Sequence, residues 1–314
     1  MYTLQVVHSY RGPLFVSFTT LMATIAAPIQ IFVYLMSLIA SDNNLPIAFH
    51  AIYGIATVLP VIIMILRVFM VDSSLFHNTN LKKKHHGRRA SKSVHFYLLL
   101  VRRYWWRMLT TSLAFFLYDF INFPNSIMSS TIISSLVKNH NIRTTAVWQL
   151  ILAVLPVPGV VVGAYLTNLV GRRTTGVIGF LGYVVLGFII GGLFHKLASH
   201  IAAFVVLYGL LQAFGHMGPG ATIGLISSES FPTPIRAMGY GVATAFGRTG
   251  AAVGTQCFTP LQDSYGKPAT FYLLGAVAVL GAAVFCLLPE TKGLDLEEED
   301  RSLKKYLADH GYEL

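Results

Sequence analysis

The stretch Met108–Leu136, MLTTSLAFFLYDFINFPNSIMSSTIISSL, is an apolar run that contains a single carboxylate, Asp119. It is longer than the roughly 20 residues that a helix needs to cross the hydrocarbon of a bilayer. A charged side chain near the bilayer centre costs roughly 3 kcal/mol on insertion scales, so such groups usually face a bundle interior and meet a partner or a solute. Asp119 therefore indicates either a solute or proton site or a buried carboxylate that fixes the helix register.

Polar side chains follow Asp119 at helical spacing. Asn122 lies three residues later, Ser126 seven residues later, and Ser130 continues the row once the kink expected at Pro124 is allowed for. Residues three, four and seven positions apart share one face of a helix, and a proline inside a helix bends it. We therefore expect one wall of this helix to be polar and to face the protein interior.

The composition is that of a polytopic membrane protein. Of 314 residues, 54% are hydrophobic and only 11% are charged, which leaves too few charges to cover the surface of a soluble domain. The net charge of +10 lies mainly between the apolar stretches, so we expect the lipid bilayer and not nucleic acid as the partner. Cys257 and Cys286 both lie in apolar stretches, and they indicate no disulfide framework.

Eight apolar stretches have the length of a transmembrane helix, which predicts an all-α fold. They are residues 13–40, 46–71, 108–136, 145–170, 174–194, 201–226, 237–258 and 270–288.

The basic residues predict the orientation of these spans. Of the 23 Lys and Arg residues, 17 fall in the two terminal segments and in every second connecting segment, while four fall in the alternate loops. Loops rich in Lys and Arg face the cytoplasm. We therefore expect both termini to be cytoplasmic, together with the basic connector at 72–107. The tail at 289–314 is expected to be a solvated amphipathic segment with no further role.

A second intramembrane charge is Arg248, in the stretch GYGVATAFGRTGAAVG. A guanidinium group stays ionised and pairs well with carboxylates and phosphates, so it needs an anion nearby in a membrane. The simplest arrangement is a resting pair of Asp119 and Arg248 that a phosphate-bearing substrate interrupts. Protonation of Asp119 would then relieve the repulsion between the acid and the anion.

Further candidates lie in the sixth predicted span. Gln212 and His216 are four residues apart on one helical face, and His216 precedes Met217-Gly218-Pro219-Gly220, a sequence that loosens a helix and frees backbone groups. His216 is either a proton carrier or a neutral hydrogen-bond donor. Gln149, at the start of the fourth span, is a weaker candidate that could instead mark the membrane interface.

Small residues recur at helical spacing in the later spans, which favours close packing of helix backbones and is also compatible with an interface that moves. They include Gly187 and Gly191, and then Gly239, Ala243, Gly247, Gly250 and Gly254.

Three motifs in the predicted cytoplasmic segments resemble those in the second half of a major facilitator superfamily transporter of the sugar-porter and phosphate-symporter branch. They are LVGRRTTG at 169–176, SESFPTPIRAMGYG at 228–241 and PETKG at 289–293. Within that branch, FLYDFINFPNSIMSSTIISS and QAFGHMGPGATIGLISSESFPT look most like the fungal glycerophosphodiester (glycerophosphoinositol) transporters.

The resemblance implies twelve helices in two six-helix bundles, with a site at the midplane and alternating access. Aligned on the motifs, the eight predicted spans correspond to the last eight of the twelve, so the first four helices are expected to be missing. Residues 1–71 would hold the last two helices of the N-terminal bundle, 108–288 a complete C-terminal six-helix bundle, and 289–314 a cytoplasmic tail.

The resemblance also implies a substrate site. Asp119 matches the acid that contacts phosphate in the symporters, Phe115 and Phe123 stand where those proteins usually have Trp and Tyr, and Arg248 replaces a Lys. The symporters carry Asn near His216. These departures favour an organic phosphodiester over inorganic phosphate. The expected substrate-binding set is Phe115, Asp119, Asn122, Phe123, Gln212, His216 and Arg248.

The motifs imply a cytoplasmic ion-pair network that resembles a latch on the inward gate. Its expected members are Arg172, Arg173, Glu229, Arg236 and Glu290, with Asn168 where the motif often has Asp.

The function implied is therefore transport of an organic phosphate such as a glycerophosphodiester, or of inorganic phosphate, by a symporter in the plasma membrane. The coupling ion would be H+, with no cofactor and no bound metal. Two alternatives stay open: a sugar-porter-type carrier, and a truncated membrane fragment that does not transport. Enzymatic chemistry is not expected, because no catalytic motif stands in a plausible context. The oligomeric state is left open.

Overall fold

The computed structural model describes residues 2–42, 44–69, 94–137, 141–294, 296–310 and 312, and within these ranges the chain is almost entirely helical. The helices are α1 (Tyr2–Ala40), α2 (Leu45–Val68), α4 (Val94–Leu136), α5 (Ile142–Val154), α6 (Pro156–Leu169), α7 (Arg172–Ala198), α8 (Ile201–Gly215), the π-helical turn η3 (His216–Gly220), α9 (Ala221–Glu229), α10 (Arg236–Tyr265), α11 (Lys267–Leu287) and α12 (Leu296–Asp309).

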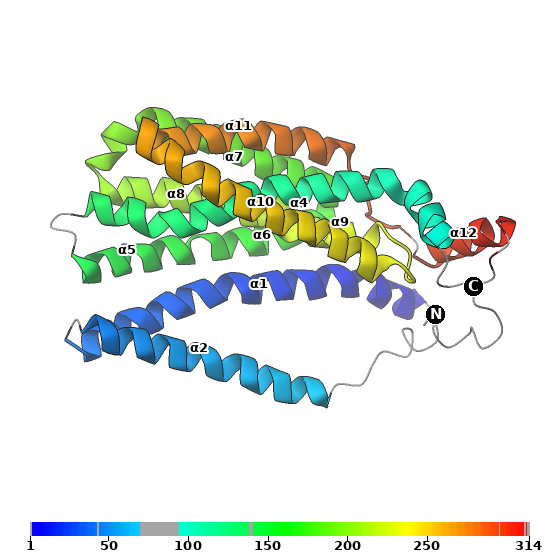
Figure 1. Ribbon diagram of the computed structural model, residues 1–314, viewed down its shortest axis with the longest axis horizontal. Helices are drawn as coiled ribbons and strands as arrows, with labels where there is room; N and C mark the ends of the chain where they lie inside the picture. The colour runs from blue at the N-terminus through cyan, green and yellow to red at the C-terminus, as the bar shows by residue number, and fades with distance from the viewer. Residues whose placement is uncertain are drawn as a thin grey trace.

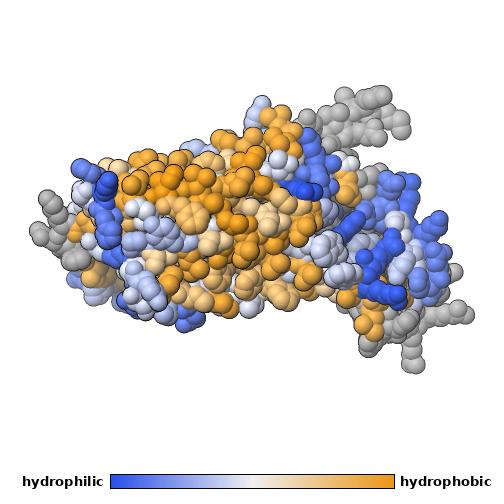
Figure 2. Space-filling model, turned by 90° about the horizontal axis from the view of Figure 1, so that it is seen from above, coloured by the Kyte–Doolittle hydropathy of each residue, from blue (hydrophilic) through white to orange (hydrophobic). Residues whose placement is uncertain are grey.

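Six helical segments of the described chain are long and apolar enough to cross a membrane, and the protein is an integral membrane protein. They are Phe18–Ala40, Leu45–Val68, Ile142–Leu169, Arg172–Ala198, Ile201–Glu229 and Lys267–Leu287. The two other predicted spans correspond to α4 and α10, which are long but more polar. A broad apolar surface, with hydrophilic residues gathered at the two ends of the long axis, matches a bilayer environment (Figure 2).

The helices form one bundle with a helical pair beside it (Figure 1). In the bundle, α10 packs along α4, and α11 packs against α7. The aromatic core lies between α7, α8 and α11, where Tyr183, Phe204, Tyr208 and Phe271 are fully buried. Helix α1 lies along α5 and α6, while α2 packs against α1 and exposes apolar side chains along most of its length.

The row of small residues packs α10 directly against α4. A Cβ atom added at Gly250 would collide with the carbonyl oxygen of Phe116, and one added at Gly254 would collide with that of Phe120. Because a helix that carries glycine can approach a neighbour more closely, these positions determine the distance between the two backbones. The packing interpretation of this row therefore agrees with the structure.

Two of the prolines inside the helical segments lie close to predicted site residues. Pro124 lies inside α4, and just after it the Tyr208 hydroxyl donates to the backbone oxygen and to Oδ1 of Asn125, at 2.8 and 2.6 Å. Pro219 lies inside η3, so the sequence that was expected to loosen the sixth span forms a π-helical turn between α8 and α9. Such turns frequently occur at functional sites.

Two expectations at the predicted cytoplasmic end need correction. Helix α4 begins at Val94, so the last part of the predicted connector is helical; the basic run at 82–89 lies outside the described residues. The tail is not simply solvated, because Leu303 and Leu307 of α12 are buried with Leu100 and Tyr104 of α4. Burial raises the pKa of the Tyr104 hydroxyl.

Polar contacts attach α12 to α4 and to the turn before α10. Arg107 Nη2 donates to Glu299 Oε1 at 3.0 Å, Arg103 Nη2 donates to Ser302 Oγ at 2.7 Å, and the backbone N–H of Thr233 donates to Asp300 Oδ1 at 2.7 Å. The helix therefore links the start of α4 to the start of α10.

Candidate functional site

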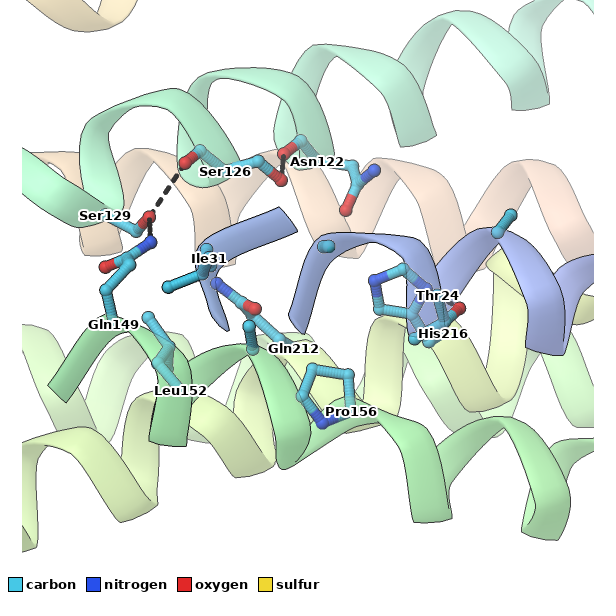
Figure 3. Close-up of a pocket in the computed structure, with 13 residues that line it drawn as sticks. Thr24, Ile31, Asn122, Ser126, Ser129, Gln149, Leu152, Pro156, Gln212 and His216 are labelled. Atoms are coloured by element: carbon cyan, nitrogen blue, oxygen red, sulfur yellow. Dashed lines mark hydrogen bonds between the residues drawn. The ribbon is translucent and has the colours of Figure 1, made fainter. Parts of the chain in front are cut away.

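A pocket of about 250 Å³ lies between α1, α4, α5 and the junction of α8 with η3 (Figure 3). We call it the polar pocket. Its polar lining residues are Thr24 from α1, Asn122, Ser126 and Ser129 from α4, Gln149 from α5, and Gln212 and His216 from α8 and η3. Apolar residues, among them Ile31 and Leu152, form the rest of the wall. Among the described residues that line the pocket there is no Asp, Glu, Lys or Arg.

Hydrogen bonds hold one end of the polar pocket in place. Gln149 Nε2 donates to Ser129 Oγ at 2.6 Å, and the Ser129 hydroxyl donates to the backbone oxygen of Ser126 at 2.8 Å. At the other end, Thr24 Oγ1 lies 3.5 Å from His216 Nδ1, so α1 meets η3 across the pocket (Figure 3). Amides and hydroxyls can both donate and accept hydrogen bonds, so this lining suits a ligand that carries hydroxyl groups.

Three of the predicted substrate-binding residues meet in the polar pocket, namely Asn122, Gln212 and His216. The structure places Phe115, Asp119, Phe123 and Arg248 outside its lining, where α4 meets α10.

The predicted pair of intramembrane charges joins α4 to α10, and Asp119 lies within one helical turn of the pocket residue Asn122. Arg248 Nη1 is 3.9 Å from Asp119 Oδ2, and its guanidinium carbon lies 5.0 Å from the centre of the Phe123 ring. The Asp119 side chain is 11% exposed, whereas that of Arg248 is 69% exposed. A Cβ atom added at Gly247 would lie 2.8 Å from Asp119 Oδ2, so a glycine here lets the carboxylate lie against α10. Their proposed roles as anion and proton handlers remain predictions.

Sequence reasoning missed two residues of the polar pocket and gave little weight to a third. Thr24 and Ser129 were not selected, and Gln149 was a weak candidate. The expected continuation of the polar row was Ser130, which instead lines a second pocket of about 380 Å³. The two pockets share Ile31 and Gln149, so these two side chains lie at the boundary between them.

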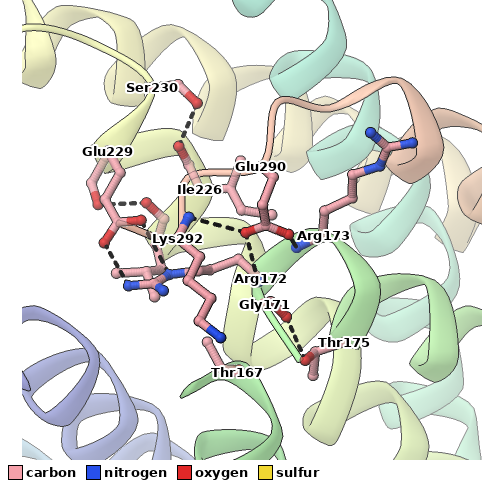
Figure 4. A network of polar contacts seen from close by, with 12 residues as sticks. Thr167, Gly171, Arg172, Arg173, Thr175, Ile226, Glu229, Ser230, Glu290 and Lys292 are labelled. Carbon is pink, nitrogen blue, oxygen red and sulfur yellow. Dashed lines mark hydrogen bonds and ion pairs between the residues drawn. The ribbon is translucent and has the colours of Figure 1, made fainter. Parts of the chain in front are cut away.

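The cytoplasmic motifs build a compact polar network (Figure 4). Arg172 Nε lies 3.3 Å from Glu229 Oε2, and Arg172 Nη2 lies 3.4 Å from Glu229 Oε1. The Glu290 carboxylate accepts backbone N–H bonds from Arg172, Arg173 and Lys292 at 3.0, 3.2 and 3.0 Å. Four of the five predicted network members therefore meet here, although Arg173 contributes its backbone.

The fifth predicted member, Arg236, lies apart from these contacts. Its Nε donates to the backbone oxygen of Phe231 at 3.3 Å, and its Nη2 donates to Thr233 Oγ1 at 3.3 Å. Burial lowers the pKa of the Arg236 guanidinium, while the charges of Asp300 and Glu229 raise it. Asn168, where the motif often has Asp, donates to the backbone oxygen of Ala164 at 3.2 Å.

Comparisons with known proteins agree with this architecture. The sequence profile of the family described as "Sugar (and other) transporter" matches residues 8–303. The chain is 70% identical over 303 residues to the "MFS-type transporter lnaF" of Aspergillus flavus, covering 96% of this chain and 60% of that protein. It is 36% identical over 306 residues to "Glycerophosphoinositol permease 1" of Candida albicans, covering 96% of this chain and 57% of that protein.

Among solved structures, a crystal structure of a double Trp mutant of XylE is similar in fold, with a TM-score of 0.66 at 17% identity. The match covers 94% of this chain and 67% of the XylE chain. The chain spans about 60% of the length of the two curated relatives named above. On the extent of the profile match and on the identity to these relatives, the chain belongs to the sugar (and other) transporter family of the major facilitator superfamily.

Proposed function

We propose that this protein takes part in membrane transport of a small organic phosphate, with the phosphate recognised by Arg248. The observation that carries the proposal is the pairing of Arg248 with Asp119, in which the largely exposed side chain of Arg248 lies 3.9 Å from the carboxylate. An Arg held so loosely keeps donors available for a second anion, and its planar fork suits phosphate. Asp119, which is buried against Gly247, would take up a proton when the phosphate arrives.

The relatives support this class of substrate. The Candida albicans protein is named for glycerophosphoinositol, a phosphodiester, and the alignment to it covers nearly the whole of this chain. Under this proposal inorganic phosphate is the smaller alternative substrate and H+ is the coupling ion.

The topology that we propose has eight membrane crossings. Helices α4 and α10 would cross together with the six more apolar segments, because α4 and α10 pack along each other within the same bundle. Both termini, the connector at 72–107 and the tail would face the cytoplasm, and the membrane would be the plasma membrane. Residues 1–71 would then belong to an N-terminal bundle and 108–288 to the C-terminal six-helix bundle.

Uptake and binding by the reconstituted chain test the proposal. In liposomes that contain the full chain, uptake of labelled glycerophosphoinositol or phosphate is expected to rise as the external pH falls. Asp119→Asn, Arg248→Ala and the double variant should each lose uptake. Arg67→Ala serves as the matched control, because Arg67 lies in the last turn of α2. Normal rate and affinity in the double variant would contradict the proposal.

A second candidate function is transport of a neutral sugar or polyol, and the lining of the polar pocket favours it. The seven polar side chains there are amides, hydroxyls and one imidazole, which suit hydroxyl groups and offer no carboxylate or guanidinium. Uptake of a free sugar that does not change in Arg248→Ala would favour this candidate. A chain that neither binds nor transports any of these solutes would instead be a non-transporting membrane protein.

A further inference from the structure

We propose that the polar pocket holds the hydroxyl-bearing alcohol part of a phosphate ester whose phosphate group lies at Arg248. This inference rests on the proposed function. It narrows the expected substrate to a phosphate ester of a polyol and excludes inorganic phosphate as the main substrate. It also assigns ligand contacts to Gln149, Ser129 and Thr24.

The chemistry of the lining separates the two parts of the ligand. A phosphate group inside the polar pocket would meet no Lys or Arg, and burying an anion without a cation is costly. Alcohol hydroxyls, in contrast, match side chains that donate and accept. Gln149 keeps one N–H and its acceptor oxygen, because its other N–H donates to Ser129, while Gln212 adds a second amide and Ser126 a hydroxyl.

Helix α4 places the two parts of the site next to each other. With 3.6 residues per turn, the side chains of Phe123, Asp119, Ser126, Asn122 and Ser129 fall within an arc of about 120° around the helix. Phe123 and Asp119 are the contacts of Arg248, and the other three residues line the polar pocket. Asp119 and Asn122 are about 4.5 Å apart along the helix axis. Because this separation is short, one small molecule would reach both the charged pair and the polar pocket.

The size of the polar pocket agrees with a part of a ligand. Its volume of about 250 Å³ lies just below the roughly 300–1,000 Å³ of pockets that enclose drug-sized molecules. Gln149, held by its hydrogen bond to Ser129, lines both pockets and so lies at the end of the polar pocket next to the second one. Gln149 therefore limits how large the alcohol part can be.

Binding of three probes to the full chain in nanodiscs tests the division of the site. The probes are inorganic phosphate, myo-inositol and glycerophosphoinositol, and the readout is the dissociation constant from calorimetry. Gln149→Leu and Gln212→Leu should each weaken glycerophosphoinositol binding roughly 10-fold, the effect of one lost buried hydrogen bond, and leave phosphate binding within about twofold. Arg248→Ala should weaken the binding of both probes that contain phosphate.

Two further variants keep the test interpretable. Ser126→Ala removes a hydroxyl whose residue is exposed, so it tests the pocket even if a Gln variant fails to fold. Gln256→Leu makes the same chemical change at an exposed position of α10 outside the pocket lining. It should leave the dissociation constants of all three probes unchanged.

Each other outcome has a definite meaning. If the pocket variants weaken the binding of inorganic phosphate as much as that of the ester, the division of the site is wrong. The same holds if they weaken the binding of neither probe, and in both cases the proposed transport of a phosphate compound still stands. If myo-inositol binds as tightly as the ester and Arg248→Ala changes nothing, the ligand is a neutral polyol and both proposals fail. If the unchanged chain binds no phosphate-containing probe, the proposed function itself is overturned.

Discussion

The protein contains two Arg–carboxylate pairs whose surroundings differ. Arg172 and Glu229 are 8% and 17% exposed in their side chains and approach each other at two pairs of atoms, and Glu290 lies next to them and fixes the backbone of Arg172. Arg248 and Asp119 make one contact at 3.9 Å, and the guanidinium group is 69% exposed. The same two chemical groups thus form a buried pair with two close approaches at one site, and a pair with an exposed guanidinium group at the other. The two Arg–carboxylate pairs therefore differ in exposure and in the number of contacting atoms, although both join an Arg to an acid.

Removing the buried cation should produce the largest effect on stability. Arg172→Ala leaves the Glu229 carboxylate buried without its partner, and breaking one side of a buried pair typically costs about 3–5 kcal/mol. The melting temperature of the detergent-solubilised protein measures the loss. Arg173→Ala is the matched control, because its backbone makes the bond to Glu290, and it should change stability by less than about 1 kcal/mol. Equal shifts for the two variants would contradict this view of the network.

Changing the backbone beside the same network should have an intermediate effect. Gly171 has φ +104° and ψ 165°, a conformation that suits glycine, and an added Cβ would lie 2.6 Å from Glu290 Oε2. Gly171→Ala should therefore cost roughly 1–3 kcal/mol in the same melting experiment.

Gly241→Ala provides the comparison for this change, since Gly241 is helical and nothing lies within 4 Å of the position that an added Cβ would take. Alanine there should be neutral or stabilise the helix by about 0.5–1 kcal/mol. A loss of stability at Gly241 as large as that at Gly171 would mean that backbone geometry is not the cause.

The smallest effect on stability is expected at the pair whose cation is exposed. Arg248→Ala removes a long contact made by a largely exposed guanidinium group, which is worth about 0–1 kcal/mol. If Arg248 serves binding and not folding, the melting temperature should change little while phosphate affinity falls. A melting shift comparable to that of Arg172→Ala would place Arg248 among the structural groups.

The apolar pattern predicted where most helices lie, because length and hydropathy determine what can occupy a bilayer. It did not predict the docking of α12. Leu303 and Leu307, four residues apart, define an apolar face, but nothing local in the sequence tells which surface covers that face. For the same reason the start of α4 at Val94 was missed, since part of its first turns packs on α12 and not on lipid.

The candidate site was predictable where a motif or a costly intramembrane charge marked it. Arg172, Glu229 and Glu290 come from motifs, and the structure brings them together. Thr24 could not be found in this way, because it meets His216 across 192 positions of sequence. Ser129 was missed in favour of Ser130 because each residue turns a helix by about 100°, so a small error in the bend at Pro124 selects the wrong neighbour.

Helix α4 is one continuous element of 43 residues, about 65 Å long, and it bears α12 near one end and the wall of the polar pocket further along. If α4 tilts as one body when the pocket widens, the surface on which α12 packs will move with it. The position of α12 would then depend on whether the polar pocket is open or closed. A dye attached to an exposed residue of that helix would report occupancy of the site from the aqueous side.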